Sequence, residues 1–189
     1  MFQELKNVFE NLRPSTDLEW NEISSYFKEL KFDKGVIITK EGQVENYLYF
    51  TVKGGTRAFY LKEGEEYSID FRFENEFTGS YISFLQQEPS RLYVQTLEPT
   101  ILYAISHFSL QKLYDKYKIG ETLGRLSAEK LLIKYQVRQA TLLLDTATER
   151  FHNLSNNKKN WIQRVPQKYL ASYLNITPEY YSRLKKELL

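Results

Sequence analysis

The sequence predicts an α+β protein: an N-terminal antiparallel β-barrel or jelly roll with flanking helices, then a long helix, then a C-terminal helix-turn-helix domain. Three observations predict this fold class. The spacing of apolar residues changes from helical to strand-like near Lys31 and returns to helical after His107. Short turns that contain glycine separate the strand-like runs, and the chain closes on two short helical patterns around a tight turn. We place the domains at residues 1–118, 119–144 and 145–189.

The first 31 residues have the apolar spacing of helices. Apolar residues three and four apart predict a first helix over about residues 2–12, and Pro14 breaks this pattern. Ser15 or Thr16 can cap a second helix, which we expect to run from about Asp17 to Glu29.

The region from Lys31 to Ser106 predicts antiparallel β-structure, because β-branched and aromatic runs alternate with turn signals. Glycines at these turns, such as Gly42 and Gly64, supply the positive φ that hairpin turns require. Pro99 marks the turn between the last two strands. The expected strands are 36–40, 47–52, 56–61, 91–97 and 100–106.

A long helix follows a short one (SLQKLYDKY) and is expected over about residues 119–153. Its part 119–144 carries a partial heptad stripe, which Lys130 interrupts. The stripe fits two interpretations: the helix packs on its own barrel, or it forms the seam of a dimer. Polar residues 155–160 predict a loop. The stripe consists of Leu123, Leu126, Ile133, Val137, Ala140 and Leu144.

The composition argues against several classes of protein. The 189 residues include no Cys and two His, and both His107 and His152 fall outside the predicted strands, so no metal site is expected. We can place neither a Ser–His–Asp set nor a glycine-rich phosphate loop, so no enzyme is expected. The N-terminus lacks an apolar signal-peptide core, and no apolar run approaches the roughly 18 residues of a spanning helix. These features predict a soluble cytoplasmic protein without a membrane partner.

The charge is divided unevenly along the chain. Residues 1–149 carry 18 Lys and Arg against 22 Asp and Glu, a net charge of −4. Residues 150–189 carry 8 Lys and Arg against 2 Glu, a net charge of +6. A basic segment on an acidic body suggests a polyanionic partner, although a solvated charged face would give the same count.

The segment QKYLASYLNITPEYYSRLKKELL predicts two helices around a turn at Asn175, Ile176 and Thr177. Pro166 can start the first helix, and Leu170, Ala171 and Leu174 form its apolar face. Thr177 caps the second helix, whose Leu184 and Leu188 point inward. Arg can bond guanine bidentately, while Lys and Tyr bond phosphates, so the outward face suits DNA. The candidate DNA-binding residues are Lys168, Thr177, Pro178, Glu179, Tyr180, Ser182, Arg183, Lys185 and Lys186.

The segment RVPQKYLASYLNITPEYYSRLKK resembles the DNA-binding end of the Crp/Fnr superfamily of bacterial transcription regulators. The stretches KGVIITKEGQ and YLYFTVKGGTRAFY resemble the cyclic-nucleotide-binding barrel of the same superfamily. The resemblance implies a homodimer joined along the long helix, near-palindromic double-stranded DNA as partner, a small effector, and RNA polymerase as a further partner. By position it assigns recognition to residues 177–187, with Glu179 and Arg183 reading bases. Pro178 replaces an Arg that many relatives use for guanine, so a different target sequence is expected.

The resemblance also implies an effector pocket in the barrel, which uses a Gly-Glu pair for the ribose and an Arg for the cyclic phosphate. Gly79 is kept, but Ser80 stands in the place of the Glu, and Arg91 lies one place from the expected Arg. The missing carboxylate disfavours cyclic AMP. Three interpretations stay open: no ligand because side chains fill the pocket, a different small effector, or cyclic AMP. The candidate pocket residues are Gly79, Ser80, Tyr81, Ser90 and Arg91.

A second function class is an interaction module whose helical tail binds a protein. The salt dependence of the affinity distinguishes the two classes. Affinity for DNA falls steeply as the salt concentration rises, whereas affinity for a protein through apolar contacts depends on it weakly.

Overall fold

The computed structural model describes residues 2–11 and 16–188, without the side chains of Ile119, Leu123 and Leu188. The chain divides into two compact units. One runs to Ala58 and includes Phe71–Glu129, and the other contains Phe59–Asp70 and the chain from Lys130 onward. The domain boundaries expected from the sequence stay a prediction. Within the described ranges, no helix combines the length and the apolar character needed to cross a bilayer.

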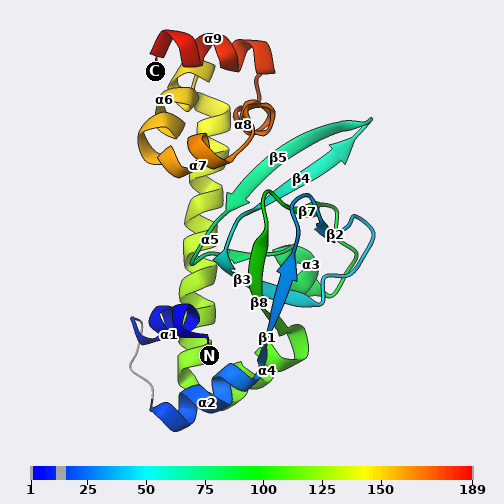
Figure 1. Ribbon diagram of the computed structural model, residues 1–189, viewed down its shortest axis with the longest axis vertical. Helices are drawn as coiled ribbons and strands as arrows, with labels where there is room; N and C mark the ends of the chain where they lie inside the picture. Colours follow the sequence, from blue (N-terminus) through cyan, green and yellow to red (C-terminus); the bar gives the residue numbers. More distant parts are fainter. Residues whose placement is uncertain (1, 12–15, 189) are drawn as a thin grey trace. The chain divides into compact units, whose positions relative to one another are not determined.

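Two sheets form the barrel, and their antiparallel pairing confirms the predicted α+β class (Figure 1). One sheet has the strand order β1-β8-β3-β6 and the other the order β2-β7-β4-β5. The strands are β1 (Phe27–Phe32), β2 (Ile37–Thr39), β3 (Tyr47–Lys53), β4 (Thr56–Lys62), β5 (Glu65–Arg72), β6 (Phe77–Thr78), β7 (Tyr93–Thr96) and β8 (Thr100–Ser106).

The glycine turns are where the sequence places them. Glu63 and Gly64 have φ of 54° and 85°, so the turn between β4 and β5 has two left-handed residues in succession, as tight hairpins need. Gly54 also has positive φ, at 92°, and a Cβ there would stand 2.6 Å from the carbonyl oxygen of Pro99. Glycine at position 54 therefore serves both the turn and the close approach of two chain segments.

The N-terminal helices are α1 (Gln3–Glu10) and α2 (Asp17–Ser25). Thr16 caps α2 in a capping box with Glu19, as predicted, whereas Pro14 and Ser15 lie outside the described residues. The prediction that the second helix reaches Glu29 is wrong. The chain turns into β1 at Phe27, which pairs with Ile105 of β8, so pairing with a distant strand overrides the local helical pattern.

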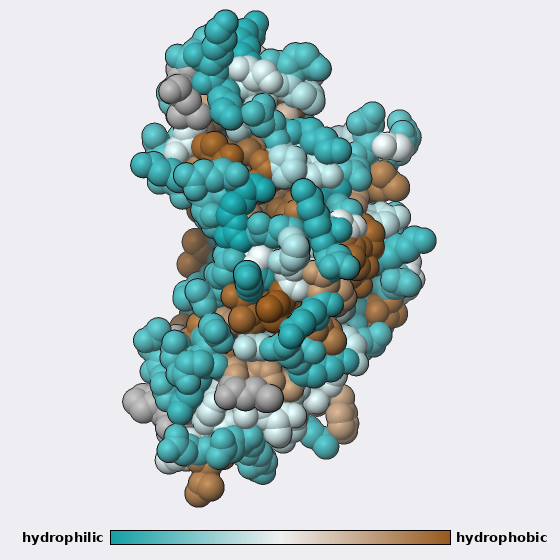
Figure 2. Space-filling model, viewed as in Figure 1, coloured by the Kyte–Doolittle hydropathy of each residue, from teal (hydrophilic) through white to brown (hydrophobic). Residues whose placement is uncertain are grey.

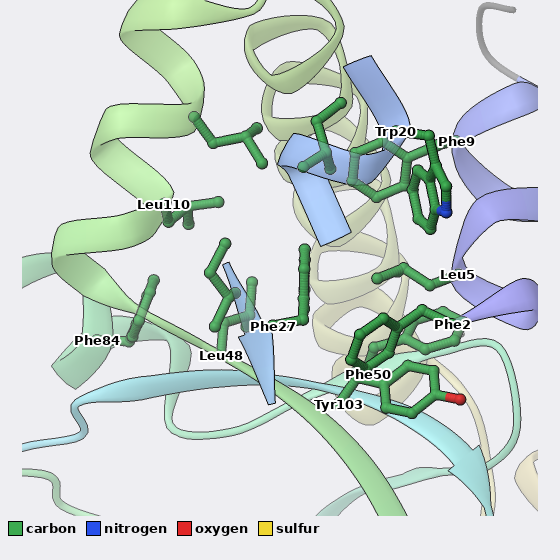
Figure 3. Close-up of a cluster of buried hydrophobic side chains, with 13 residues drawn as sticks. Phe2, Leu5, Phe9, Trp20, Phe27, Leu48, Phe50, Phe84, Tyr103 and Leu110 are labelled. Carbon is green, nitrogen blue, oxygen red and sulfur yellow. The ribbon is translucent and has the colours of Figure 1, made fainter. Parts of the chain in front are cut away.

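The core of the first unit joins helices and strands (Figure 3). The ring of Phe9 on α1 meets the ring of Trp20 on α2 edge-on, with centroids 5.7 Å apart. Phe2 meets Tyr103 of β8 at 4.4 Å in the same geometry. The buried members of this core are Phe2, Leu5, Phe9, Trp20, Ile23, Phe27, Leu48, Phe50, Phe84, Tyr103, Ile105, Leu110 and Leu113.

Helix α3 (Tyr81–Gln86) lies between β6 and β7, and α4 (His107–Lys116) and α5 (Lys118–Leu144) follow β8. The short α3 was not predicted, because its six residues make fewer than two turns and show no helical period. The start of α5 packs tightly on α4, since a Cβ at Gly124 would stand 2.7 Å from the hydroxyl of Tyr114. Glycine therefore lets the two helices approach closely.

The second unit contains α6 (Ala147–Asn157), α7 (Lys159–Arg164), α8 (Gln167–Leu174) and α9 (Pro178–Leu188). The expected continuous helix over 119–153 is wrong, because Thr146 starts a new helix with a capping box to Glu149. The expected loop over 155–160 is also wrong. Helices α6 and α7 meet at Lys158, and the hydroxyl of Ser155 bonds the Phe151 carbonyl oxygen inside α6.

Candidate nucleic-acid interface and barrel pocket

Helices α8 and α9 form a helix-turn-helix whose turn is built as the sequence predicts. Asn175 ends α8 in the left-handed conformation, with φ 55° and ψ 48°. The backbone N–H of Ile176 donates to the carbonyl oxygen of Ala171 at 3.0 Å. The hydroxyl of Thr177 accepts from the backbone N–H of Tyr180 at 3.2 Å and so caps α9. The chain therefore reverses direction in a few residues without leaving these backbone groups unsatisfied.

The inner face of α9 is anchored by two buried side chains. Leu184 is buried, as predicted, whereas the side chain of Leu188 lies outside the described residues. Tyr181 is fully buried, and its ring meets the ring of Phe151 on α6 edge-on at 5.4 Å. Tyr181 was not among the residues predicted to point inward, although its spacing of three residues from Leu184 indicates the same helix face.

The outer face of α9 is polar and cationic. Ser182, Arg183 and Lys186 are exposed, while Tyr180 and Lys185 are half-buried. The guanidinium of Arg183 lies 4.6 Å from the ring centroid of Tyr180, which holds the Arg by a cation–π contact. In Figure 2 the surface at the top of the view, where Figure 1 places α9, is mostly hydrophilic.

The remaining candidate residues surround the start of α9. Thr177, Pro178 and Glu179 are exposed at its first turn, and Lys168 is exposed on α8. The backbone N–H of Glu179 and the hydroxyl of Thr177 hold the pKa of the Glu179 carboxyl below its ordinary value. Glu179 is therefore a charged acceptor at neutral pH, as contact with a cytosine amino group would require.

Two arginines fix helix α8 to its neighbours, one from the second half of α5 and one from α6. Arg138 of α5 donates to the carbonyl oxygen of Tyr173, and its guanidinium lies 3.8 Å from the centroid of the Tyr173 ring. Nε of Arg150 on α6 donates to the carbonyl oxygen of Leu174 at 3.0 Å. Both arginines thus satisfy carbonyls at the end of α8, where the helix leaves them without internal donors.

The outer part of the β4–β5 hairpin also contacts α8 within the second unit. The hydroxyl of Ser172 accepts from the backbone N–H of Ser68 at 2.9 Å and donates to the carbonyl oxygen of Glu66 at 2.7 Å. Nζ of Lys134 on α5 lies 2.6 Å and 2.8 Å from the two carboxylate oxygens of Asp70. The orientation of the helix-turn-helix is therefore set by α5, α6 and this hairpin together.

The predicted stripe on α5 is largely exposed in the single chain. Ile133, Val137 and Leu144 have 62%, 59% and 80% of their surface exposed, and Ala140 is exposed as well. Figure 2 shows a hydrophobic patch near the middle of the left-hand edge, where Figure 1 places α5. Exposed apolar surface of this kind marks interaction sites. Leu126 is half-buried, Lys130 is exposed, and the side chain of Leu123 lies outside the described residues.

In the barrel, the structure brings together some of the candidate pocket residues and separates another. Ser80 and Ser90 are buried, with hydroxyl oxygens 2.8 Å apart. Gly79 precedes them with φ 134°, a conformation that favours glycine. Tyr81 is half-buried at the start of α3, whereas Arg91 is exposed. An exposed Arg91 does not line an enclosed site with the two serines.

A buried carboxyl group that the sequence analysis missed lies at this point. Glu45 is 4% exposed, and its Oε2 accepts from the hydroxyl of Thr39 and from the backbone N–H of Ser80. Its Oε1 accepts from the backbone N–H of Tyr47 at 3.2 Å and from the hydroxyl of Tyr49 at 3.3 Å. Burial raises the pKa of Tyr49, so this hydroxyl stays a donor at neutral pH. Glu45 could not be singled out from the sequence, because the backbone N–H of Ser80, 35 residues further along the chain, comes near it only in the fold.

The pKa of Glu45 predicts a pH effect on stability. Burial raises this pKa, and the donors from Thr39, Tyr47, Ser80 and Tyr49 lower it by less. The folded state therefore binds the proton of Glu45 more tightly than the unfolded state does. The stability that this proton contributes is lost as pH rises from the ordinary pKa of Glu through the raised pKa of Glu45. We expect the melting temperature of the wild type to fall relative to that of Glu45→Gln as pH rises from about 4.3. Parallel melting curves across this range would contradict the expectation.

Comparison with known proteins identifies the fold. Residues 29–117 match the family described as the cyclic nucleotide-binding domain. Comparison with curated proteins returns no match. FixK2 from Bradyrhizobium japonicum is similar in structure with a TM-score of 0.72 and 21% sequence identity, over 86% of this chain and 84% of FixK2.

Two further solved structures cover most of this chain. CLP from Xanthomonas campestris, a global regulator responsive to c-di-GMP, has a TM-score of 0.68 and 19% identity, over 91% of each chain. A protein described as a transcriptional regulator of the Crp/Fnr family from Eubacterium rectale has a TM-score of 0.70 and 13% identity, over 92% of this chain and 83% of that one. Residues 29–117 thus resemble a cyclic nucleotide-binding domain. The chain is similar in fold to Crp/Fnr regulators, which agrees with the resemblance seen in the sequence.

Proposed function

We propose that this protein is a DNA-binding transcription regulator of the Crp/Fnr type, which binds near-palindromic double-stranded DNA as a homodimer. The observation that carries the proposal is α9, which buries Tyr181 and Leu184 and exposes Ser182, Arg183 and Lys186. A helix with one buried face and one cationic face, presented by a helix-turn-helix, suits the major groove. The fold shared with regulators supports this function and gives no reason to propose an enzyme.

The side chains of the interface have three roles. Arg183 reads guanine, because its planar fork of donors matches the two acceptors on the guanine edge. Glu179 accepts from cytosine. Lys168, Lys185 and Lys186 contact phosphates, which fix the position of the helix without reading sequence. Thr177, Tyr180 and Ser182 add hydrogen bonds at the edge of the groove.

The apolar stripe on α5 is proposed as the dimer seam. Two copies related by a twofold axis would bury the exposed Ile133, Val137, Ala140 and Leu144 against each other. The symmetry then presents two α9 helices to successive major grooves, about 34 Å apart on one side of the duplex. The near-palindromic operator follows from the same symmetry. A regulator of this kind acts in the cytoplasm together with RNA polymerase.

The experiment that tests the function is selection of bound fragments from sheared genomic DNA. The purified protein should enrich fragments that share a near-palindromic sequence, and titration should show one dimer bound per site. Indifference to every fragment at about 50 mM salt, where phosphate contacts are strong, would reject the proposal.

Arg183→Ala should cost about 1–3 kcal/mol on the selected site and weaken random DNA less. The cause is loss of the bidentate contact to guanine, which random sequence offers only in part. Fluorescence anisotropy with both duplexes measures the difference, and Lys40→Ala on the barrel, where Lys40 is exposed, is the control. Equal weakening on both duplexes would make Arg183 a phosphate contact instead.

A further inference from the structure

The cyclic nucleotide-binding family implies a ligand with a negatively charged phosphate, and the barrel has to supply donors for it. The hydrogen-bond donors gathered beside Gly79 are the backbone N–H of Ser80 and of Tyr47 and the hydroxyls of Thr39 and Tyr49. All of them point at one carboxyl group, that of Glu45. These donors therefore suit a bound anion, but the group that they bind is the chain's own Glu45 carboxyl.

Space and charge at this point both work against a second anion. A Cβ built on Gly79 would stand 3.7 Å from Oε2 of Glu45, so the carboxyl group lies directly against the glycine. Glu45 is 4% exposed, and its backbone N–H is bonded to the hydroxyl of Ser83 at 2.9 Å, which fixes the segment that carries it. A phosphate brought near a buried carboxylate would meet like charge in a medium that screens it poorly.

The groups that would hold the rest of a nucleotide are also absent from the site. Ser80 stands where a ribose-binding carboxylate is expected, and its hydroxyl pairs with that of Ser90 at 2.8 Å. The hydroxyl of Ser90 in turn lies 2.9 Å from the carbonyl oxygen of Leu92. Arg91 is exposed. The described residues at this position thus bond to one another.

We infer that the carboxyl group of Glu45 is a built-in occupant of the anion position in the barrel, and that the protein consequently binds no cyclic nucleotide there. The donors around Glu45 form a site for a small carboxylate, filled by a tethered one. This inference does not depend on DNA binding, because it concerns only the first unit.

The test uses thermal unfolding of the full chain in three forms: wild type, Glu45→Ala and Glu45→Gln. The wild type should show no shift in melting temperature with cyclic AMP or cyclic GMP at millimolar concentration. Glu45→Ala should melt roughly 5–10 °C lower, because several buried donors lose their acceptor. Sodium acetate should recover part of that loss by filling the vacated space, whereas sodium chloride at equal concentration should not. Glu45→Gln keeps the space filled, so acetate should not raise its melting temperature.

Each outcome decides the inference. A saturable upward shift of the wild type with either cyclic nucleotide would overturn it, as would a Glu45→Ala variant as stable as the matched control Glu41→Ala, whose Glu41 is exposed. Equal changes of melting temperature with acetate in all three forms would contradict the assignment of Glu45 as the occupant. If Glu45→Ala fails to fold while Glu41→Ala folds, the buried carboxyl group is essential at this position, and the nucleotide titration of the wild type decides whether the barrel binds a cyclic nucleotide. Failure of DNA binding would leave all of these results unchanged.

Discussion

Val137→Glu is expected to leave the protein monomeric at micromolar concentration and to weaken binding to its operator by roughly 100-fold or more. Val137 is 59% exposed on α5, between Ile133 and Ala140 on the same helix face. In the proposed dimer this face is buried, so the substitution would place two carboxylates in an apolar seam without partners. A monomer holds one half-site at a time and loses the gain that comes from tethering the second.

Sedimentation measures the oligomeric state, and anisotropy with the selected duplex measures the affinity. Gln139→Glu is the matched control, because Gln139 is also exposed on α5 but lies on the opposite side from the stripe, so it introduces the same charge outside the seam. This control should remain dimeric and bind as the wild type does. A Val137→Glu variant that is still dimeric, or a wild type that is monomeric, would show that the seam lies elsewhere.

The parts of the fold that could be predicted from the sequence are those set by local chemistry. Gly64 marks the β4–β5 turn because a two-residue hairpin turn with positive φ at both positions favours glycine. Asn175 and Thr177 likewise specify the turn and cap of the helix-turn-helix. The parts that were missed depend on distant partners. Strand β1 forms because it pairs with β8, which lies some seventy residues further along the chain.

The candidate sites divide in the same way. The outer face of α9 could be read from spacing, since every member lies on one helix. The contacts that support this helix pair could not be predicted, because they join distant segments of the chain. Arg138 of α5 bonds the end of α8, and Ser172 of α8 bonds the β4–β5 hairpin. In the barrel, the sequence indicated that Ser80 removes a nucleotide contact. Only the fold brings Glu45 to that position, so the question of occupancy could not be answered from the residues alone.

Replacing both Lys185 and Lys186 by Ala should weaken binding to specific and random DNA alike and flatten the dependence of affinity on salt. Lys186 is exposed and Lys185 is half-buried on the outer side of α9. Each Lys that contacts a phosphate releases one counterion, which contributes about 0.9 to the slope of log affinity against log salt. A dimer that loses four such contacts should therefore have a slope shallower by roughly 3–4.

The measurement is a salt titration of anisotropy from about 50 to 200 mM with a random duplex, where counterion release supplies nearly all of the binding. Lys185→Arg with Lys186→Arg keeps both charges and should retain the slope. Lys34→Ala with Lys40→Ala removes two exposed charges from the barrel and should retain it as well. An unchanged slope in the alanine double variant would place these lysines away from the phosphates. If binding to the selected partner depended only weakly on salt in every form, the tail would be a protein-binding surface, since apolar contacts release few counterions.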